Sequence, residues 1–101
     1  MSRTLVIEPE AEHELESAAL WYDLKQDGLA VRFLTAIDDT VSSILFAPHG
    51  YQRIKGAIRQ APVKGFPFVI IYATLHDAIV VLSVFHTSRD PRKKRMRSRR
   101  R

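Results

Sequence analysis

The sequence has no cysteine and no apolar run long enough to cross a membrane. The lack of cysteine excludes a disulfide scaffold, a zinc site with thiolate ligands and a cysteine nucleophile. The apolar run at residues 65–75 is far shorter than the about 20 residues that a membrane-spanning helix needs. No apolar signal-peptide core follows the N-terminus, so we expect a cytoplasmic protein.

The residues that are present suit one small domain. The chain has 101 residues, of which 46% are hydrophobic and 27% are charged, and it is too short for two domains. An aromatic content of 9% argues against a wholly disordered chain.

Charge is divided unevenly along the chain. Residues 89–101 carry nine Lys/Arg and one Asp, a net charge of +8, whereas residues 1–88 carry seven Lys/Arg and ten Asp/Glu, a net charge of −3. The body is therefore mildly acidic and the C-terminal end strongly basic. Because like charges at this density repel, we expect a single domain at residues 1–91 and a disordered basic tail at residues 92–101.

Hydrophobic spacing predicts a strand followed by two helices. Residues 3–7 have the pattern of a short strand, and Pro9 predicts the start of a helix. The sequence Asp27-Gly28 ends that helix, and a second one begins near Leu29. The apolar stripe of the first helix comprises Ala11, Leu15, Ala18, Ala19 and Tyr22, and that of the second Ala30, Phe33, Leu34, Ile37, Val41, Ile44 and Leu45. Two helices joined so closely predict an antiparallel helical hairpin.

The rest of the chain predicts β-structure. Residues 52–63 are a possible strand interrupted at Gly56, and residues 66–74 and 79–85 are strong strands that a turn joins into an antiparallel pair. The predicted fold is α+β, in the order β-α-α-β-β-β. It has an N-terminal strand, an antiparallel helical hairpin and then a curled antiparallel sheet of three strands.

These elements resemble those of the RelE/ParE toxin superfamily over residues 3–91. The resemblance ends on His86-Thr87-Ser88-Arg89-Asp90-Pro91, which is similar to the His-x-x-Arg-Asp-Pro ending of the ParE-like branch. Further segments that carry it are Pro9-Glu10-Ala11-Glu12, Trp21-Tyr22, Arg32-Phe33-Leu34, Pro48-x-Gly50, Arg53-x-x-Gly56-x-x-Arg59 and residues 66–72 and 79–86.

The resemblance implies the toxin of a type II toxin–antitoxin system, neutralised by a cognate antitoxin encoded beside it. RelE-like members cleave mRNA on the ribosome, whereas ParE-like members inhibit DNA gyrase. RelE-like nucleases tend to carry a C-terminal tyrosine, and this chain has none after Tyr72. The ParE-like ending commonly has an aromatic residue soon after Asp-Pro, where Lys93 and Lys94 stand here.

Three residues are candidates for RNA cleavage, which needs proton-transfer groups and cations but no metal. These are Arg59, His86 and Arg89, with Lys55 and Lys64 as weaker phosphate contacts. The alternative is a structural or partner-binding role, in which His86 bonds a loop carbonyl and Arg89 pairs with a carboxylate. We expect no cofactor and no metal, because Glu10, His13 and Glu16 on one helix supply too few ligands.

The tail has three possible roles. Its cations Arg92, Lys93, Lys94, Arg95 and Arg97 are candidates for nucleic-acid binding through phosphate contacts. The alternatives are a solvated end without a partner, which is favoured about as much as nucleic-acid binding, and contact with an acidic antitoxin segment, which is favoured less.

We therefore expect a ParE-like toxin whose main property is protein binding rather than catalysis. The antitoxin should lie over apolar surface along the helical hairpin and the sheet edge, giving a toxin–antitoxin hetero-oligomer. DNA gyrase is the expected target. One alternative is a metal-independent mRNA endonuclease that acts on the ribosome, and the other is a non-toxic nucleic-acid-binding protein.

Overall fold

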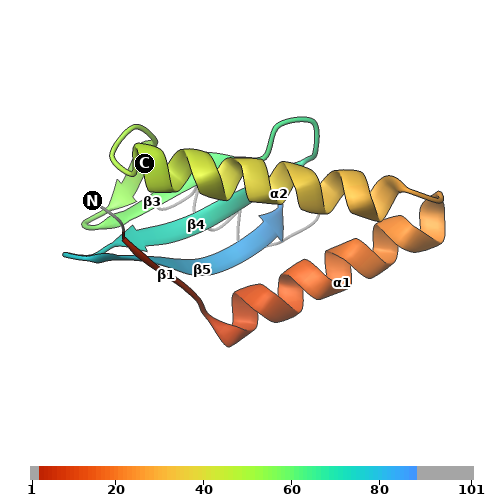
Figure 1. The fold of residues 1–101 in the computed structure, drawn as a ribbon, viewed down its shortest axis with the longest axis horizontal. Helices are drawn as coiled ribbons and strands as arrows, with labels where there is room; N and C mark the ends of the chain where they lie inside the picture. The colour runs from red at the N-terminus through yellow and green to blue at the C-terminus, as the bar shows by residue number, and fades with distance from the viewer. Residues whose placement is uncertain (1–2, 89–101) are drawn as a thin grey trace.

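The computed structural model describes residues 3–88, which form five strands and two helices. In chain order these are β1 (Thr4–Ile7), α1 (Pro9–Lys25), α2 (Leu29–Phe46), β2 (Gln52–Lys55), β3 (Ile58–Pro62), β4 (Phe68–Thr74) and β5 (Ala78–His86). The helices lie side by side, with α1 next to β5 and α2 over the middle of the sheet (Figure 1). The expected tail at residues 92–101 is outside the described residues.

Both helices begin where the sequence predicts. Pro9 occupies the first turn of α1, where its missing N–H is not needed, and Glu10 and Glu12 lie at the positive end of the helix dipole. Gly28 precedes α2 with a φ of +83°, a left-handed conformation that favours glycine and lets the chain reverse between the helices. The predicted helical hairpin is confirmed.

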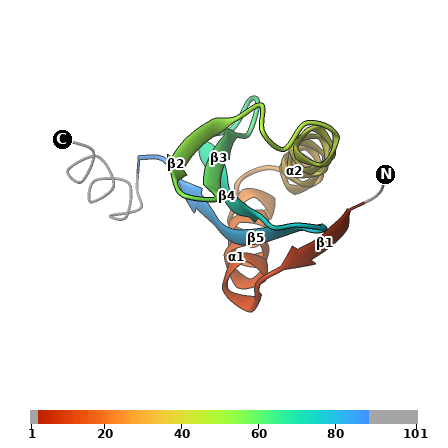
Figure 2. The same cartoon turned by 90° about the vertical axis from the view of Figure 1, so that its left-hand side faces the viewer.

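The sheet is mixed and open, with the strand order β1-β5-β4-β3-β2 (Figure 2). Its pairs β2–β3, β3–β4 and β4–β5 are antiparallel, whereas β1 runs parallel to β5. The predicted α+β fold is confirmed, but the prediction of an antiparallel sheet of three strands was wrong, because the sheet has five strands and includes the N-terminal strand as a parallel neighbour of β5. The predicted antiparallel pairing of the last two strands is confirmed.

The conformation of Gly56 and the long-range pairing of β1 account for the differences between the predicted and the observed sheet. Gly56 has a φ of +56°, so the chain turns back there and residues 52–63 form the hairpin β2–β3 instead of one interrupted strand. The N-terminal strand joins the sheet beside β5, the last strand, and the long connection between them through both helices and β2–β4 lets the two run in the same direction, as a parallel pair requires.

Four aromatic rings of the core, those of Tyr22, Phe33, Phe66 and Phe68, lie in contact between the helices and the sheet. Phe33 of α2 lies 5.0 Å from Tyr22, 5.3 Å from Phe66 and 5.1 Å from Phe68, measured between ring centroids. Phe33 is completely buried. Leu34, which the helical repeat placed on the apolar stripe, is 39% exposed. The aromatic cluster thus ties both helices to β4 and to the loop before it.

Glu14 of α1 completes the edge of β5. β1 pairs with β5 only as far as Val81, so the next part of that edge has no strand neighbour within the described chain. One carboxylate oxygen of Glu14 accepts hydrogen bonds from the Val84 backbone N–H and the Ser83 hydroxyl, both at 2.9 Å. Because a buried N–H without a partner is costly, this carboxylate positions α1 against the sheet.

Tyr72 fastens the loop after α2 to the middle of the sheet. Its buried hydroxyl donates a 2.7 Å hydrogen bond to the Pro48 carbonyl. Burial raises the pKa of Tyr72, an effect that the nearby Arg59 charge partly offsets and Tyr51 reinforces. Arg59 holds the end of the same loop, because its guanidinium donates a 2.7 Å hydrogen bond to the Tyr51 carbonyl.

We expect Phe33→Ala to lower the free energy of unfolding by about 3–5 kcal/mol, because it empties the centre of the aromatic cluster. Phe46→Ala is a matched control on the same helix, since Phe46 is 90% exposed, and should change stability by less than about 0.5 kcal/mol. Urea unfolding of both variants measures the difference. Equal losses would contradict this assignment of the core.

Tyr72→Phe should destabilise the fold by about 1–3 kcal/mol at neutral pH, because the Pro48 carbonyl loses its donor. The raised pKa of Tyr72 means that the unfolded state loses the phenol proton first as pH rises. Wild-type stability should therefore fall above about pH 10, and its advantage over Tyr72→Phe should shrink there. Denaturation midpoints from pH 7 to 11 test this, and a constant difference would refute it.

Candidate partner-binding groove

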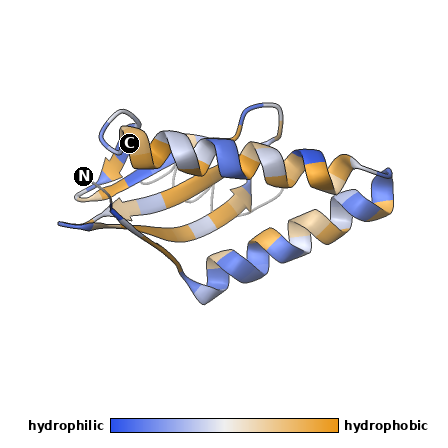
Figure 3. Ribbon diagram, in the orientation of Figure 1, coloured by the Kyte–Doolittle hydropathy of each residue, from blue (hydrophilic) through white to orange (hydrophobic). Residues whose placement is uncertain are grey.

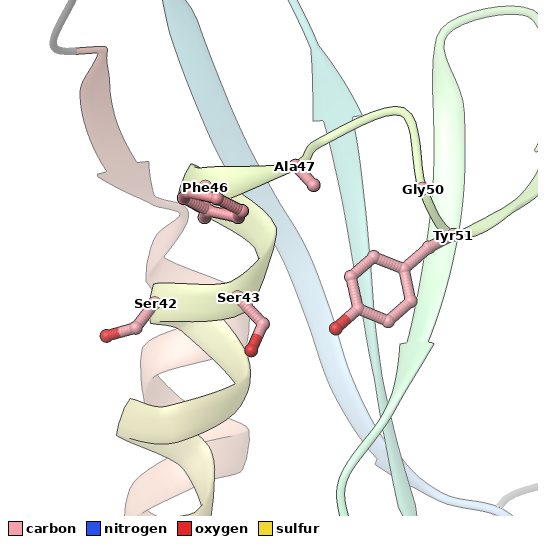
Figure 4. Close-up of a pocket in the computed structure, with 6 residues that line it drawn as sticks. All are labelled: Ser42, Ser43, Phe46, Ala47, Gly50 and Tyr51. Atoms are coloured by element: carbon pink, nitrogen blue, oxygen red, sulfur yellow. The ribbon is translucent and has the colours of Figure 1, made fainter.

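A groove lies between α2 and the chain segment that returns from it to the sheet. It consists of two adjoining hollows of about 540 and 310 Å³, which share Ser43 and Tyr51. Tyr51 projects from the loop towards α2, on the side where Ser43 lies (Figure 4). We call this the α2 groove. Its lining residues are Ala36, Asp39, Thr40, Ser42, Ser43, Phe46, Ala47, Gly50, Tyr51, Pro62 and Lys64.

Small side chains on α2 leave the groove open. Ala36, Ser43 and Ala47 recur at helical spacing and face the loop and β3 without filling the space. Thr40 is buried between them, and its hydroxyl donates to the Ala36 carbonyl at 2.8 Å. The helix side of the groove is therefore shallow, and the Thr40 hydroxyl on that side already has a hydrogen-bond partner.

Phe46 stands at the end of the groove and is 90% exposed. It is out of phase with the buried positions Phe33, Ile37 and Ile44, so its position in the helical repeat already placed it away from the core. A large exposed aromatic side chain next to a hollow gives a second molecule both an anchor and a space to fill.

The strand side of the groove is basic. Residues 40–76 contain four Lys/Arg and no Asp or Glu. Lys64 lines the groove, and the exposed Arg53 and Lys55 lie on the edge strand β2. Asp39 on the helix side is the acidic residue in the lining. A segment that enters from the strand side therefore meets mainly positive charge.

The structure separates two of the predicted catalytic residues. Arg59 pairs with Tyr72 across the β3–β4 ladder, and His86 pairs with Phe68 across the β4–β5 ladder. Tyr72 and Phe68 are four residues apart on β4, roughly 13 Å along the strand. The backbone positions of Arg59 and His86 are therefore well separated along the sheet.

Each of these two side chains also has a local role. Arg59 is half-buried, and its guanidinium holds the Tyr51 carbonyl. The His86 ring lies 5.2 Å from the Phe68 ring, and its Nδ1 accepts a hydrogen bond from the Ser88 N–H at 3.1 Å. His86 thus holds the start of the segment that follows β5 through the Ser88 N–H.

The other predicted site residues are scattered or fall outside the described part. Lys55 ends β2 and is exposed, whereas Lys64 reaches the α2 groove. Arg89 and the tail cations Arg92, Lys93, Lys94, Arg95 and Arg97 lie outside the described residues. Within residues 3–88, no three His, Asp or Glu side chains gather where they could hold a metal ion, and neither helix is long and apolar enough to cross a membrane.

Sequence reasoning missed the groove and most of its residues. The sequence analysis places Tyr72 in a strand and does not single out Tyr51, because nothing in their spacing shows that the two ring centroids lie 6.4 Å apart. The usable signal was Phe46, an aromatic residue outside the apolar repeat of its own helix.

Comparisons with known proteins agree with this architecture. The chain is similar to a chromosomal ParDE toxin–antitoxin system from P. aeruginosa, at 18% identity and a TM-score of 0.70, covering 84% of this chain and 96% of that one. It is also similar to a copper-bound mutant toxin from Helicobacter pylori, at 14% identity and a TM-score of 0.55, covering 85% of this chain and 96% of that one. No curated protein matches the sequence.

The sequence itself matches a family model over residues 5–91, which includes every described helix and nearly all of the strands. The model is that of the ParE toxin of the type II toxin–antitoxin system parDE. The chain therefore belongs to the ParE toxin family and is the toxin of a type II toxin–antitoxin system.

Proposed function

We propose that this toxin is neutralised by an antitoxin segment bound along the α2 groove, and that it acts in the cytoplasm by inhibiting DNA gyrase without cleaving a substrate. The observation that carries the first part is the groove itself, where the exposed Phe46 adjoins a hollow of about 540 Å³. The proposed toxin–antitoxin complex agrees with the ParDE system that the fold resembles.

The groove suits a helical or extended polypeptide. An amphipathic helix can place apolar side chains on Phe46 and Tyr51 at helical spacing. β2 ends the sheet, so an extended continuation of the same segment can pair with its outer edge. The basic side chains Arg53, Lys55 and Lys64 favour an acidic segment there.

Inhibition by binding is favoured over RNA cleavage by the positions of Arg59 and His86. Ribonuclease chemistry needs an acid, a base and a cation within hydrogen-bond reach of one phosphate. Arg59 is engaged with the Tyr51 carbonyl, and His86 lies roughly 13 Å away along the sheet. This arrangement supports an activity that depends on surface contact, as inhibition of gyrase does.

The basic residues 92–101 would add non-specific contacts with nucleic acid. We assign them this supporting role as a tail that follows the domain of residues 1–91, with Arg92, Lys93, Lys94, Arg95 and Arg97 as the phosphate contacts. Such contacts weaken steeply as salt rises.

Phe46→Ala should weaken binding of the cognate antitoxin by about tenfold or more, because it removes the aromatic anchor beside the groove. Leu75→Ala is the matched control. Leu75 is 54% exposed in the turn between β4 and β5 and does not line the groove, so affinity should be unchanged. Calorimetric titration measures both variants. An unchanged affinity of the Phe46→Ala variant would show that the antitoxin binds another surface.

Purified toxin should inhibit DNA supercoiling by gyrase and leave mRNA on translating ribosomes intact. His86→Ala should keep this inhibition and arrest growth as the wild type does, provided that its thermal unfolding is unchanged. A catalytic His86 would instead cost about 10²–10⁴-fold in activity when removed. Loss of growth arrest by a folded His86→Ala variant, together with cleaved mRNA in wild-type cells, would establish the endonuclease alternative.

A further inference from the structure

The two edges of the sheet differ in how well they are protected against pairing with another strand. β2, at one edge, carries Arg53 and Lys55, and its pairing with β3 is irregular between them. β1, at the other edge, consists of one threonine and three aliphatic residues, with no charge, no proline and a regular register against β5. Charges, prolines and bulges are the features that keep an edge strand from pairing. Within residues 3–88, the outer side of β1 is therefore open and unprotected (Figure 2).

The aliphatic side chains of β1 are exposed on both faces of the sheet. Leu5 is 37% exposed, Val6 39% and Ile7 41%. Leu5 and Ile7 share one face and Val6 lies on the other, because side chains alternate along a strand. β1 is apolar over most of its length, and the hydrophilic start of α1 follows it (Figure 3). Such an edge fits another strand, which covers both faces, better than a helix, which would cover one.

The backbone groups that face outwards on this edge belong to Leu5 and Ile7. The Thr4 N–H donates to the carbonyl of the residue before β5 at 2.9 Å, and the Glu8 N–H donates to a carbonyl in the middle of β5 at 3.0 Å. Every second residue from Thr4 to Glu8 therefore directs its backbone groups towards β5. The N–H and C=O groups of Leu5 and Ile7 point the other way, where an added strand can bond them.

A second copy of β1, running antiparallel to the first, matches this edge in register. When Val6 of one copy lies opposite Val6 of the other, Leu5 of each copy lies opposite Ile7 of the other. Leu5 and Ile7 share a face and both have outward backbone groups, so each such pair exchanges two hydrogen bonds and packs aliphatic side chains together. A two-fold axis passes through the Val6 pair, so the pairing is closed and ends at a dimer.

Charge at the two ends of β1 favours a second copy over the antitoxin. Arg3 precedes the strand and Glu8 and Glu10 follow it, and all three are exposed. In the antiparallel dimer, Arg3 of each copy comes level with Pro9 of the other, between Glu8 and Glu10. An acidic segment of the kind that we assign to the α2 groove would instead bring its carboxylates to these glutamates. Self-pairing of β2 is opposed by its own cations, because like charges opposite each other repel.

We propose that β1 is a self-association surface, through which two copies of this toxin form an antiparallel two-fold dimer with one continuous sheet. This inference goes beyond the proposed function and does not rest on it. β1 and β2 lie at opposite edges of the sheet, so the dimer leaves both α2 grooves open to the antitoxin. One short strand from each copy buries less than the about 1,200 Å² of a standard stable interface, so the dimer should dissociate on dilution.

Charges introduced at Val6 test the pairing in the full-length toxin. Val6→Lys or Val6→Glu places two like charges opposite each other at the two-fold axis, so each variant alone should raise the dissociation constant of the dimer by about tenfold or more. An equimolar mixture of the two variants brings opposite charges together and should form the dimer again. Val31→Lys, the same change at a residue that is 67% exposed on α2, is the matched control and should dimerise as the wild type does. Sedimentation velocity over a dilution series measures each sample, and thermal unfolding confirms that each variant is folded.

Leu5→Pro tests the hydrogen bonds without a change of charge. The Leu5 N–H faces outwards, so a proline there removes a hydrogen bond of the dimer and none to β5. This variant should stay folded and lose the dimer.

A wild-type toxin that stays monomeric at its highest soluble concentration would overturn the proposal. So would a dimer that Val6→Lys leaves unchanged, or a mixture of the two Val6 variants that stays monomeric. Assembly beyond a dimer would also refute it, because β1 would then pair with β2 of the next copy in an open chain. Antitoxin affinity should be equal for the wild type and Val6→Lys, and a loss of about tenfold would show that the antitoxin covers β1 instead.

Discussion

The contact of the Tyr22, Phe33, Phe66 and Phe68 rings determines where everything else in the molecule lies. It joins both helices to β4 and to the loop before it at one point, with ring centroids 5.0–6.2 Å apart. Since edge-to-face and tilted ring contacts are directional, they fix the position of the hairpin along its axis as well as its distance from the sheet. Displacement of this cluster would shift α2 relative to the sheet and so change the width of the α2 groove.

Polar contacts fix the parts of the chain that the aromatic rings do not reach. Glu14 takes the place of a missing strand neighbour at the β5 edge, while Tyr72 and Arg59 fasten the loop that follows α2. The Tyr72 side chain from β4 and the Arg59 side chain from β3 donate hydrogen bonds to two backbone carbonyls of the same loop. The loop therefore holds Tyr51 in a fixed position facing α2. Arg59 therefore positions the loop that forms one side of the groove.

The spacing of residue types predicted those structural features that depend only on residues close together in the sequence. The helix starts at Pro9 and Leu29 and the β4–β5 pair follow from turn residues and apolar repeats within one element. The parallel pairing of β1 with β5 depends on more than 70 intervening residues, and no local pattern contains that direction. Gly56 shows the limit of a local signal, because a glycine in a strand-like segment can interrupt a strand or reverse it, and only its φ of +56° decides. The α2 groove was equally inaccessible, since Ser43, Tyr51 and Lys64 come from separate segments.

The division of charge explains how so small a domain can offer two surfaces. A chain with net charge near zero spread evenly would give any partner the same weak field everywhere. Here residues 8–39 carry −7 and residues 40–76 carry +4, so the helices and the strands from β2 to β4 present opposite signs to solution. Long-range attraction would orient an acidic partner towards the strand side before contact, and the apolar anchor Phe46 would add the short-range energy. The separation of signs along the sequence thus becomes a separation of charge in space, because the two helices form one contiguous segment and strands β2 to β4 another.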